Sequence, residues 1–159
     1  MLDEPLSCTY IFLMSHPPLK PEQSLGYLTG VAHRALGSRL NRLFAEAGLD
    51  LTAEQWGALA MLWNRDGLTQ QDLASALGLE KSSLSRLVDG LERRGYARRV
   101  PGTEDARQKQ VRLTTKADSI RDRATAIVQG NLEEARRGIR EAELELCRDV
   151  LRRVLANLS

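Results

Sequence analysis

The polar side chains best suited to molecular recognition share one face of a predicted helix over residues 81–94. The apolar face of this helix consists of Leu84, Leu87, Val88 and Leu91. Because these residues recur at i, i+3, i+4 and i+7, they must face the core, and the opposite face must point outward. The outward face carries Ser82, Arg86, Asp89 and Arg93. Small hydroxyls and a planar guanidinium on one exposed face are suited to contacts with phosphate groups and with the edge of guanine.

A second candidate is the pair Asp105 and Arg107, which stand two residues apart in a charged stretch. The carboxylate could hold the guanidinium extended, ready to enter a narrow minor groove of DNA. An exposed ion pair of little energetic consequence is the alternative for so short a motif. The position of the pair, soon after the 81–94 helix, favours the first interpretation.

Other reactive side chains do not form recognisable sites. Cys8, His16, His33 and Cys147 are capable of binding zinc, but no two of them have ligand spacing. The sequence also lacks a phosphate-binding loop, a nucleophile elbow and a His-Glu metal motif. We therefore expect no metal, no cofactor and no enzymatic activity. A redox role for Cys8 or Cys147 would require a basic, accessible thiol, and it is not part of the main prediction.

The elements that position these residues are predicted to be mainly helical. Hydrophobic residues make up 42% of the 159 and aromatic residues only 4%, so the core must consist mainly of Leu, Ala and Val. Residues 1–23 hold four of the five prolines. They are predicted to form either an extended arm or a disordered segment. An amphipathic helix is expected from Ser24 to about Gly48. Thr52 and Gln55 predict a capping box that opens a second helix through about Asn64. The predicted apolar face of this second helix consists of Trp56, Leu59, Ala60 and Trp63.

Two short helices and a hairpin follow. Thr69 is the expected cap of a helix over residues 70–77, and Gly78 begins the turn that leads to the 81–94 helix. Two short helices joined by a tight turn form a helix-turn-helix. Residues 96–100 and 109–113 are compatible with β-strands and predict a hairpin with a polar tip, the wing of a winged helix.

Two further amphipathic helices are expected at the end of the chain. Either Thr114 or Thr115 caps the first of them, and Glu141 begins the second. The apolar seam of the last helix consists of Leu144, Cys147, Leu151, Val154, Leu155 and Leu158. Such a seam has too few partners in a domain of this size, and a homodimer would bury it.

Charge is unevenly distributed along the chain. Residues 80–116 contain ten Lys and Arg against five Asp and Glu, although the whole chain carries only +2. A basic segment of this kind predicts salt-dependent binding to nucleic acid. Two distant cysteines and the absence of a basic, apolar leader favour a soluble protein in a reducing cytoplasm, with no membrane partner.

The segment Leu68–Thr114 closely resembles the DNA-binding core of MarR regulators. The resemblance includes the Ser-Ser-Leu-Ser-Arg stretch of the 81–94 helix and the Asp-x-Arg of the wing, and the flanking helices extend it over most of the chain after Ser24. It implies a mainly α fold with a small β-hairpin wing, in which residues 52–114 form the winged helix-turn-helix. It also implies dimerisation helices at residues 24–51 and 115–159, within one domain at residues 24–159.

The resemblance further implies a sequence-specific transcriptional regulator that binds a palindromic operator in double-stranded DNA as a homodimer. Repression relieved by a small aromatic or anionic effector is the expected mode, and activation stays open. The residues expected to contact DNA are Gln70, Lys81, Ser82, Ser83, Ser85, Arg86, Asp105, Arg107 and Lys109. His33, Arg34 and Trp56 are the candidates for the effector site, although a surface helix is the preferred explanation of the first two and a core aromatic that of Trp56. A winged helix that binds another protein is the alternative function, and it predicts no salt-dependent affinity for DNA.

Overall fold

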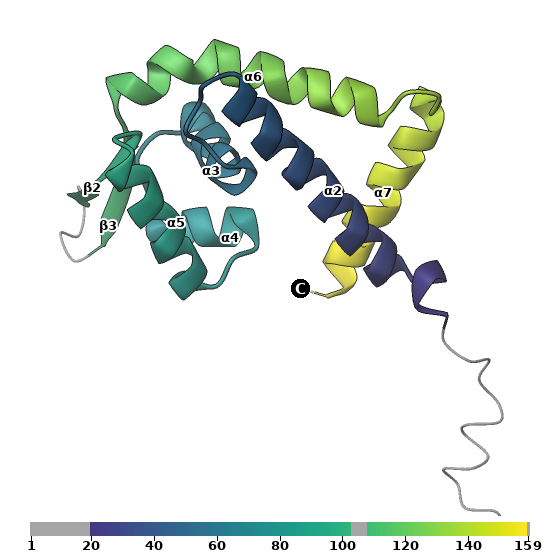
Figure 1. Ribbon diagram of the computed structural model, residues 1–159. Helices are drawn as coiled ribbons and strands as arrows, with labels where there is room; N and C mark the ends of the chain where they lie inside the picture. Colours follow the sequence, from purple (N-terminus) through teal and green to yellow (C-terminus); the bar gives the residue numbers. More distant parts are fainter. Residues whose placement is uncertain (1–19, 103–107, 159) are drawn as a thin grey trace, which may run out of the picture. The chain divides into compact units, whose positions relative to one another are not determined.

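Helices dominate the part of the chain that the computed structural model describes, residues 20–102 and 108–158 (Figure 1). The chain divides into two units, with the boundary between Ala35 and Leu36. The helix α2 (Leu25–Glu46) runs across this boundary, close to the predicted range. No helix among the described residues is both long and apolar enough to span a membrane.

The described part of the first unit contains a short 3-10 helix, η1 (Pro21–Gln23), and the first half of α2. The Ser24 hydroxyl donates to the Pro21 carbonyl at 2.8 Å and accepts from the Tyr27 amide at 3.2 Å, so it caps the start of α2. Between residues 20 and 35 no side chain is fully buried. Leu25, Tyr27, Leu28 and Val31 are exposed there.

The second unit begins with the end of α2 and continues into α3 (Ala53–Asn64), which opens with the predicted capping box. The Gln55 amide nitrogen of the backbone donates to the Thr52 hydroxyl at 3.2 Å, and the Thr52 amide donates to the Gln55 side chain at 3.2 Å. The predicted apolar face of this helix was wrong in part. The fully buried residues are Gln55, Ala58, Leu59 and Leu62. Trp56 and Trp63 are only half-buried at the edge of the core, since large indoles are seldom covered completely.

The helix-turn-helix consists of α4 (Gln70–Leu77) and α5 (Lys81–Arg93). Thr69 caps α4 by accepting from the Asp72 amide at 3.1 Å. The turn begins at Gly78, whose φ of 62° is strained for any residue with a Cβ. The Leu79 amide then donates back to the Ala74 carbonyl at 2.9 Å, which closes the end of α4.

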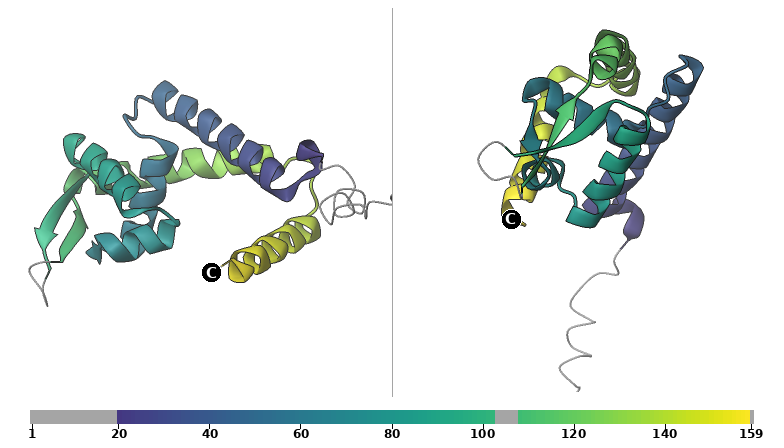
Figure 2. Two further views of the ribbon diagram at one scale, coloured as in Figure 1. Left: turned by 90° about the horizontal axis from the view of Figure 1, so that it is seen from below. Right: turned by 90° about the vertical axis from the view of Figure 1, so that its left-hand side faces the viewer.

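A three-stranded antiparallel sheet follows the helix-turn-helix, in the order β1 (Leu68–Thr69), β3 (Lys109–Leu113), β2 (Ala97–Pro101). The hairpin of β2 and β3 was predicted, with β2 displaced by one residue from the expected range. The strand β1 was not predicted, because two residues are too few to show an alternating pattern. It pairs Leu68 with Val111, and so joins the start of the helix-turn-helix to the wing (Figure 2).

The last two helices are α6 (Thr115–Ala135) and α7 (Glu141–Asn157). Thr114 is the cap of α6, since its hydroxyl accepts from the Ala117 amide at 3.3 Å. The predicted apolar stripe of α6 is confirmed: Ala124 and Val128 are buried, and Ile120 and Ile127 pack against the core. In α7, by contrast, no residue is buried in the single chain.

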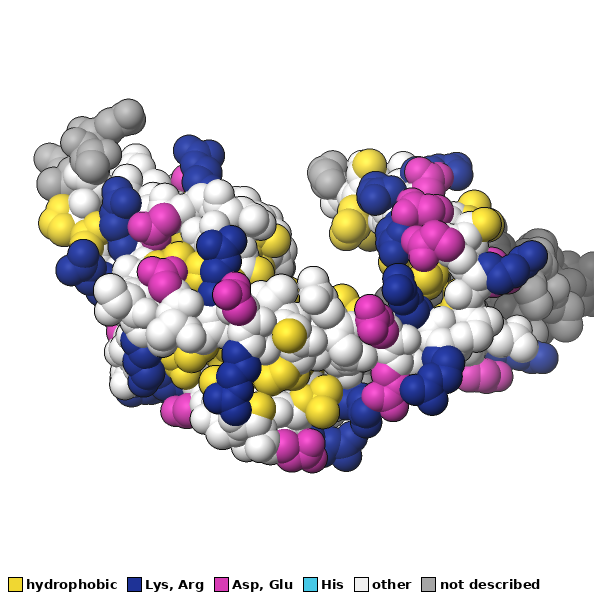
Figure 3. Space-filling model, turned by 90° about the horizontal axis from the view of Figure 1, so that it is seen from above, with side chains coloured by type: hydrophobic (Ala, Val, Ile, Leu, Met, Phe, Trp, Pro, Cys, Tyr) yellow, Lys and Arg dark blue, Asp and Glu magenta, His cyan; other side chains and the backbone are white. Residues whose placement is uncertain are grey.

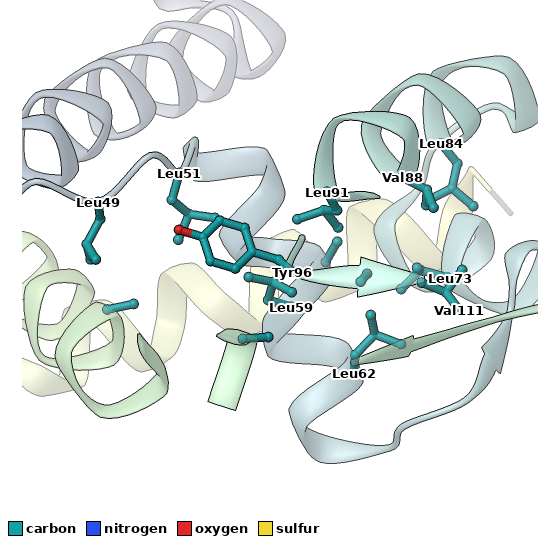
Figure 4. Close-up of a cluster of buried hydrophobic side chains, with 14 of the residues drawn as sticks. Leu49, Leu51, Leu59, Leu62, Leu73, Leu84, Val88, Leu91, Tyr96 and Val111 are labelled. Atoms are coloured by element: carbon teal, nitrogen blue, oxygen red, sulfur yellow. The ribbon is translucent and has the colours of Figure 1, made fainter. Parts of the chain in front are cut away.

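The core of the second unit joins the helices α2 to α6 to the sheet. Figure 4 shows part of this core. Its largest fully buried side chains are Phe44, Leu59, Leu62, Leu73, Leu84, Leu91, Val88 and Val111. Tyr96, at the entry to β2, is 3% exposed. Burial, and then the nearby carboxylate of Asp50, raises the pKa of Tyr96 above its ordinary value, so this phenol stays protonated at neutral pH.

Two helical glycines are expected to respond in opposite ways to substitution by alanine. A Cβ at Gly90 in α5 would lie 2.7 Å from the Gln55 amide nitrogen, and Gln55 is buried and held by its capping box. A Cβ at Gly130 in α6 would meet nothing within 4 Å. Gly130→Ala should raise the free energy of unfolding by about 0.5–1 kcal/mol through helix propensity alone. Gly90→Ala should lower it, because overpacking costs about 1–3 kcal/mol and exceeds the same propensity gain. Urea unfolding of both variants tests this; equal stabilisation would show that Gln55 moves freely.

Candidate nucleic-acid interface

The exposed face of α5 is the centre of the candidate interface. Leu84, Val88 and Leu91 fix the orientation of this helix, since they are at most 1% exposed. On the opposite side Ser82, Arg86 and Arg93 are exposed, as predicted. The Arg86 Nε donates weakly to the Ser82 carbonyl at 3.4 Å, which leaves the terminal nitrogens of the guanidinium accessible. This face can therefore present a planar donor fork to an external acceptor.

The other predicted residues on α5 differ in exposure. Lys81 is exposed at the first position of the helix, whereas Ser83 and Ser85 are half-buried. Asp89 was expected to point outward with Arg86, and its side chain is 48% exposed. Its carboxylate lies 2.7 Å from the Arg99 guanidinium of β2, so it forms an ion pair with the wing and does not stand free on that face.

Arg99 is the residue of the candidate interface that sequence reasoning missed. Its side chain is 15% exposed and contacts three successive turns of α5 through Ser85, Asp89 and Glu92. The Arg99 backbone amide also donates to the Glu92 carboxylate at 2.7 Å. A signal was present, because Arg99 follows buried Ala97 by two residues in a strand and must share its inward face. The result is an ionic clamp between the wing and α5.

Gln70, at the start of α4, belongs to the same clamp. Its side-chain oxygen accepts from the Arg99 Nε at 2.8 Å. Ser85 is engaged as well, because its carbonyl accepts from the Arg99 Nη2 at 3.0 Å and its hydroxyl lies 3.4 Å from the same nitrogen. Both residues were predicted to face DNA directly. The structure adds that each is held in place by an arginine of the wing.

The wing contributes Lys109, which is exposed at the start of β3. Asp105 and Arg107, the predicted minor-groove pair, lie outside the described residues. The base of the wing is tied to the turn after α3, since the Leu113 amide donates to the Asp66 carboxylate at 2.9 Å. Just before the start of β2, the Arg94 carbonyl accepts from Lys116 of α6 at 2.6 Å, and the Lys116 ammonium lies 4.8 Å from the centre of the Tyr96 ring.

A hollow of about 550 Å³ lies between α4, the turn and the start of β3. Its lining residues are Thr69, Gln70, Gln71, Ala74, Ser75, Gly78, Leu79, Glu80, Lys81, Gln108 and Lys109. Three of the predicted DNA-contacting residues, Gln70, Lys81 and Lys109, are thus brought together around one surface depression. Among the described residues of this lining, Glu80 is the only acidic one.

The candidate effector residues fall in different units. His33 and Arg34 are exposed on α2 in the first unit. Trp56 lies on α3 in the second unit, half-buried, and its indole N–H is buried without an acceptor among the described residues. Trp63 has the same feature, with the Arg121 guanidinium 5.9 Å from its ring centre.

The residues considered for metal or redox chemistry are scattered. Cys8 and His16 lie outside the described residues, and Cys147 is a free, exposed thiol on α7. Within residues 20–102 and 108–158, no three His, Cys, Asp or Glu side chains are grouped so that they could hold a metal ion.

A family model described as the MarR family matches residues 49–108. Solved structures are similar over much more of the chain. The crystal structure of transcriptional regulator PA3341 is 39% identical in sequence and has a TM-score of 0.71, and the match covers 85% of this chain and 98% of that chain.

Two other similar structures contain a bound partner. The complex of MepR from S. aureus with DNA has a TM-score of 0.74 at 26% identity and covers 88% of this chain and 100% of that chain. CouR from Rhodococcus jostii RHA1, bound to p-coumaroyl-CoA, has a TM-score of 0.72 at 25% identity and covers 85% of this chain and 94% of that chain.

Proposed function

Since this chain belongs to the MarR family of transcriptional regulators, we propose that it binds a specific sequence in double-stranded DNA as a homodimer. The observation that carries the proposal is the exposed face of α5, on which Ser82 and Arg86 stand opposite a buried apolar face. As the second helix of a helix-turn-helix, α5 is the element that enters a major groove. The DNA complex of the similar protein MepR supports this assignment.

The proposed contacts divide into two groups by chemistry. Arg86 reads a base, since its fork can pair with the O6 and N7 of guanine. Lys81 and Lys109 bind phosphates and set the position of the protein on the duplex. The remaining proposed contacts are Gln70, Ser82, Ser83 and Ser85, together with Asp105 and Arg107, for which the Asp-x-Arg spacing of the sequence is the support.

The proposed dimer uses residues 24–51 and 115–159. Leu146, Val150 and Leu155 are exposed on α7, and Leu158, directly after its last residue, is exposed as well. A hollow of about 640 Å³ also lies beside α7, with Leu36, Leu132, Ile139 and Leu144 among its lining residues. Apolar side chains appear between the charged ones on the face shown in Figure 3. A second copy would bury such apolar surface, and the twofold symmetry of the dimer would match a palindromic operator.

We further propose repression that an effector relieves. A dimer bound across two half-sites would block a promoter, and a ligand that changes the spacing of the two reading helices would release it. The p-coumaroyl-CoA bound to the similar protein CouR supports a small aromatic or anionic effector. His33, Arg34 and Trp56 are the residues proposed to contact it.

Footprinting on the DNA upstream of its own gene, followed by affinity measurements at several salt concentrations, tests the proposed function. We expect a symmetric protected site and an affinity that falls steeply as salt rises, because lysines and arginines release counterions from the duplex. Binding without salt dependence, or without preference for any sequence, would favour a protein-binding module instead.

Arg86→Ala and Lys109→Ala are expected to have distinct effects on DNA binding. Loss of Arg86 should cost about 1–3 kcal/mol on the operator and relax sequence preference at one position of each half-site. Loss of Lys109 should weaken specific and random duplexes equally and reduce the salt slope by about one. Fluorescence anisotropy with both duplexes measures these effects. Identical profiles for the two variants would contradict the proposed division of roles.

A further inference from the structure

The Arg99 guanidinium is fully used inside the protein. Its Nε donates to Gln70, its Nη1 contacts Asp89 and Glu92, and its Nη2 donates to Ser85. With every nitrogen engaged and 15% of the side chain exposed, Arg99 is not placed to contact DNA itself. Its effect on DNA must come through the residues that it holds.

Arg99 determines which group of the Gln70 side-chain amide faces outward. An arginine has only donors, so the Gln70 amide must present its oxygen to the Arg99 Nε, 2.8 Å away. The NH₂ group is on the other branch of the planar amide and turns away from Arg99. Among the described residues it has no hydrogen-bond acceptor. Gln70 is therefore presented as a donor, and an external acceptor is its natural partner.

The surroundings of Gln70 favour an anion as that acceptor. Gln70 lines the same hollow as Lys81 and Lys109, and Glu80 is the one acidic residue in the part of the lining that the structure describes. Two ammonium groups and one amide NH₂ suit a phosphodiester, which offers only acceptors. A base contact fits less well, because the pairing of glutamine with adenine uses the amide oxygen as well as the NH₂.

We propose that Arg99 is a positioning residue for phosphate binding: it holds Gln70 with the NH₂ outward, and Gln70, Lys81 and Lys109 then bind one DNA phosphate in the hollow. The proposal rests on the proposed function and adds to it separate roles for the residue that positions and the residues that bind the phosphate. The wing acts on the contact between α4 and the DNA backbone through this clamp, in which Arg99 and Gln70 are 29 residues apart in the sequence.

A double-mutant cycle with Gln70→Ala and Arg99→Lys tests the coupling. Lysine keeps the charge beside Asp89 and Glu92 but cannot donate to Gln70 with the geometry of the guanidinium. Each single variant is expected to lower the affinity of the full-length protein about tenfold, on the footprinted operator and on a random duplex alike. The double variant should be no weaker than Arg99→Lys, because Gln70 is then already misplaced. The salt slope should not change, since neither substitution removes a charge.

Arg98→Lys is the matched control, because Arg98 is the exposed neighbour of Arg99 on the other face of β2. It should bind DNA like the wild type. Gln70→Glu keeps an oxygen for Arg99 but replaces the NH₂ with negative charge, so it should bind DNA less well than Gln70→Ala while its melting temperature is maintained.

Three results would overturn the inference. The first is a double variant in which the two losses of DNA affinity multiply, as independent effects would. The second is a loss of affinity that is confined to the operator duplex. The third is an equal loss of affinity for Arg98→Lys and Arg99→Lys. Each of them leaves the proposed function intact. Wild-type protein that shows no salt-dependent affinity for any duplex would instead remove the proposed function and this inference with it.

Discussion

Leu151→Glu is expected to convert the dimer into a monomer and to weaken operator binding by a factor of about 10²–10⁴. Leu151 lies on the seam of α7 with Leu144 and Val154, and none of the three is fully buried in the single chain. A carboxylate at this position would have to be buried between two copies without a partner, which strongly opposes association. Once the dimer is lost, the second half-site no longer adds to the affinity.

Ala156→Glu is the control for this prediction, because residue 156 is exposed on the opposite side of α7. It introduces the same charge on the same helix and should leave both mass and affinity unchanged. Light scattering at micromolar concentration gives the mass, and anisotropy with the operator gives the affinity. A Leu151→Glu protein that stays dimeric would show that the seam is not the dimer interface.

Phe44→Ala is expected to lower the free energy of unfolding by about 3–5 kcal/mol, the largest stability effect that we predict. Phe44 is fully buried near the end of α2 and is one of the largest side chains of the core. Its removal forfeits the transfer free energy of the ring and leaves a cavity that rigid helices cannot fill by collapse.

Glu46→Ala serves as the control, since Glu46 is exposed two residues later in the same helix. Its effect should stay within about 0.5 kcal/mol. Urea unfolding at one fixed protein concentration compares the variants, because dimerisation would make the apparent stability depend on concentration. A loss below about 1 kcal/mol for Phe44→Ala would mean that the core repacks around the gap.

The ends of the helices could be predicted from the sequence because their chemistry is local. Thr52, Thr69 and Thr114 each cap the helix that follows by accepting from the backbone amide three residues later. Both partners of such a bond lie within one turn, so the order of residues is enough to predict it. The same holds for the turn at Gly78 and for the outward face of α5, which depends on helical spacing alone.

Contacts between distant segments were not predictable in this way. The strand β1 exists because Leu68 pairs with Val111, 43 residues further along the chain. The burial of Gln55 beside Gly90 likewise depends on how closely α3 approaches α5. Periodicity identifies which residues could be buried, but packing selects among them.

The candidate interface shows both sides of this division. Ser82 and Arg86 were assigned to an exposed face by the sequence itself, since the apolar spacing of α5 leaves them no other place. The clamp of Arg99 with Gln70, Asp89 and Glu92 was decided only by the tertiary structure. A sequence pattern predicts that a charged side chain is exposed to solvent. Only folding brings together the opposite charges and hydrogen-bond acceptors that allow such a side chain to be largely buried.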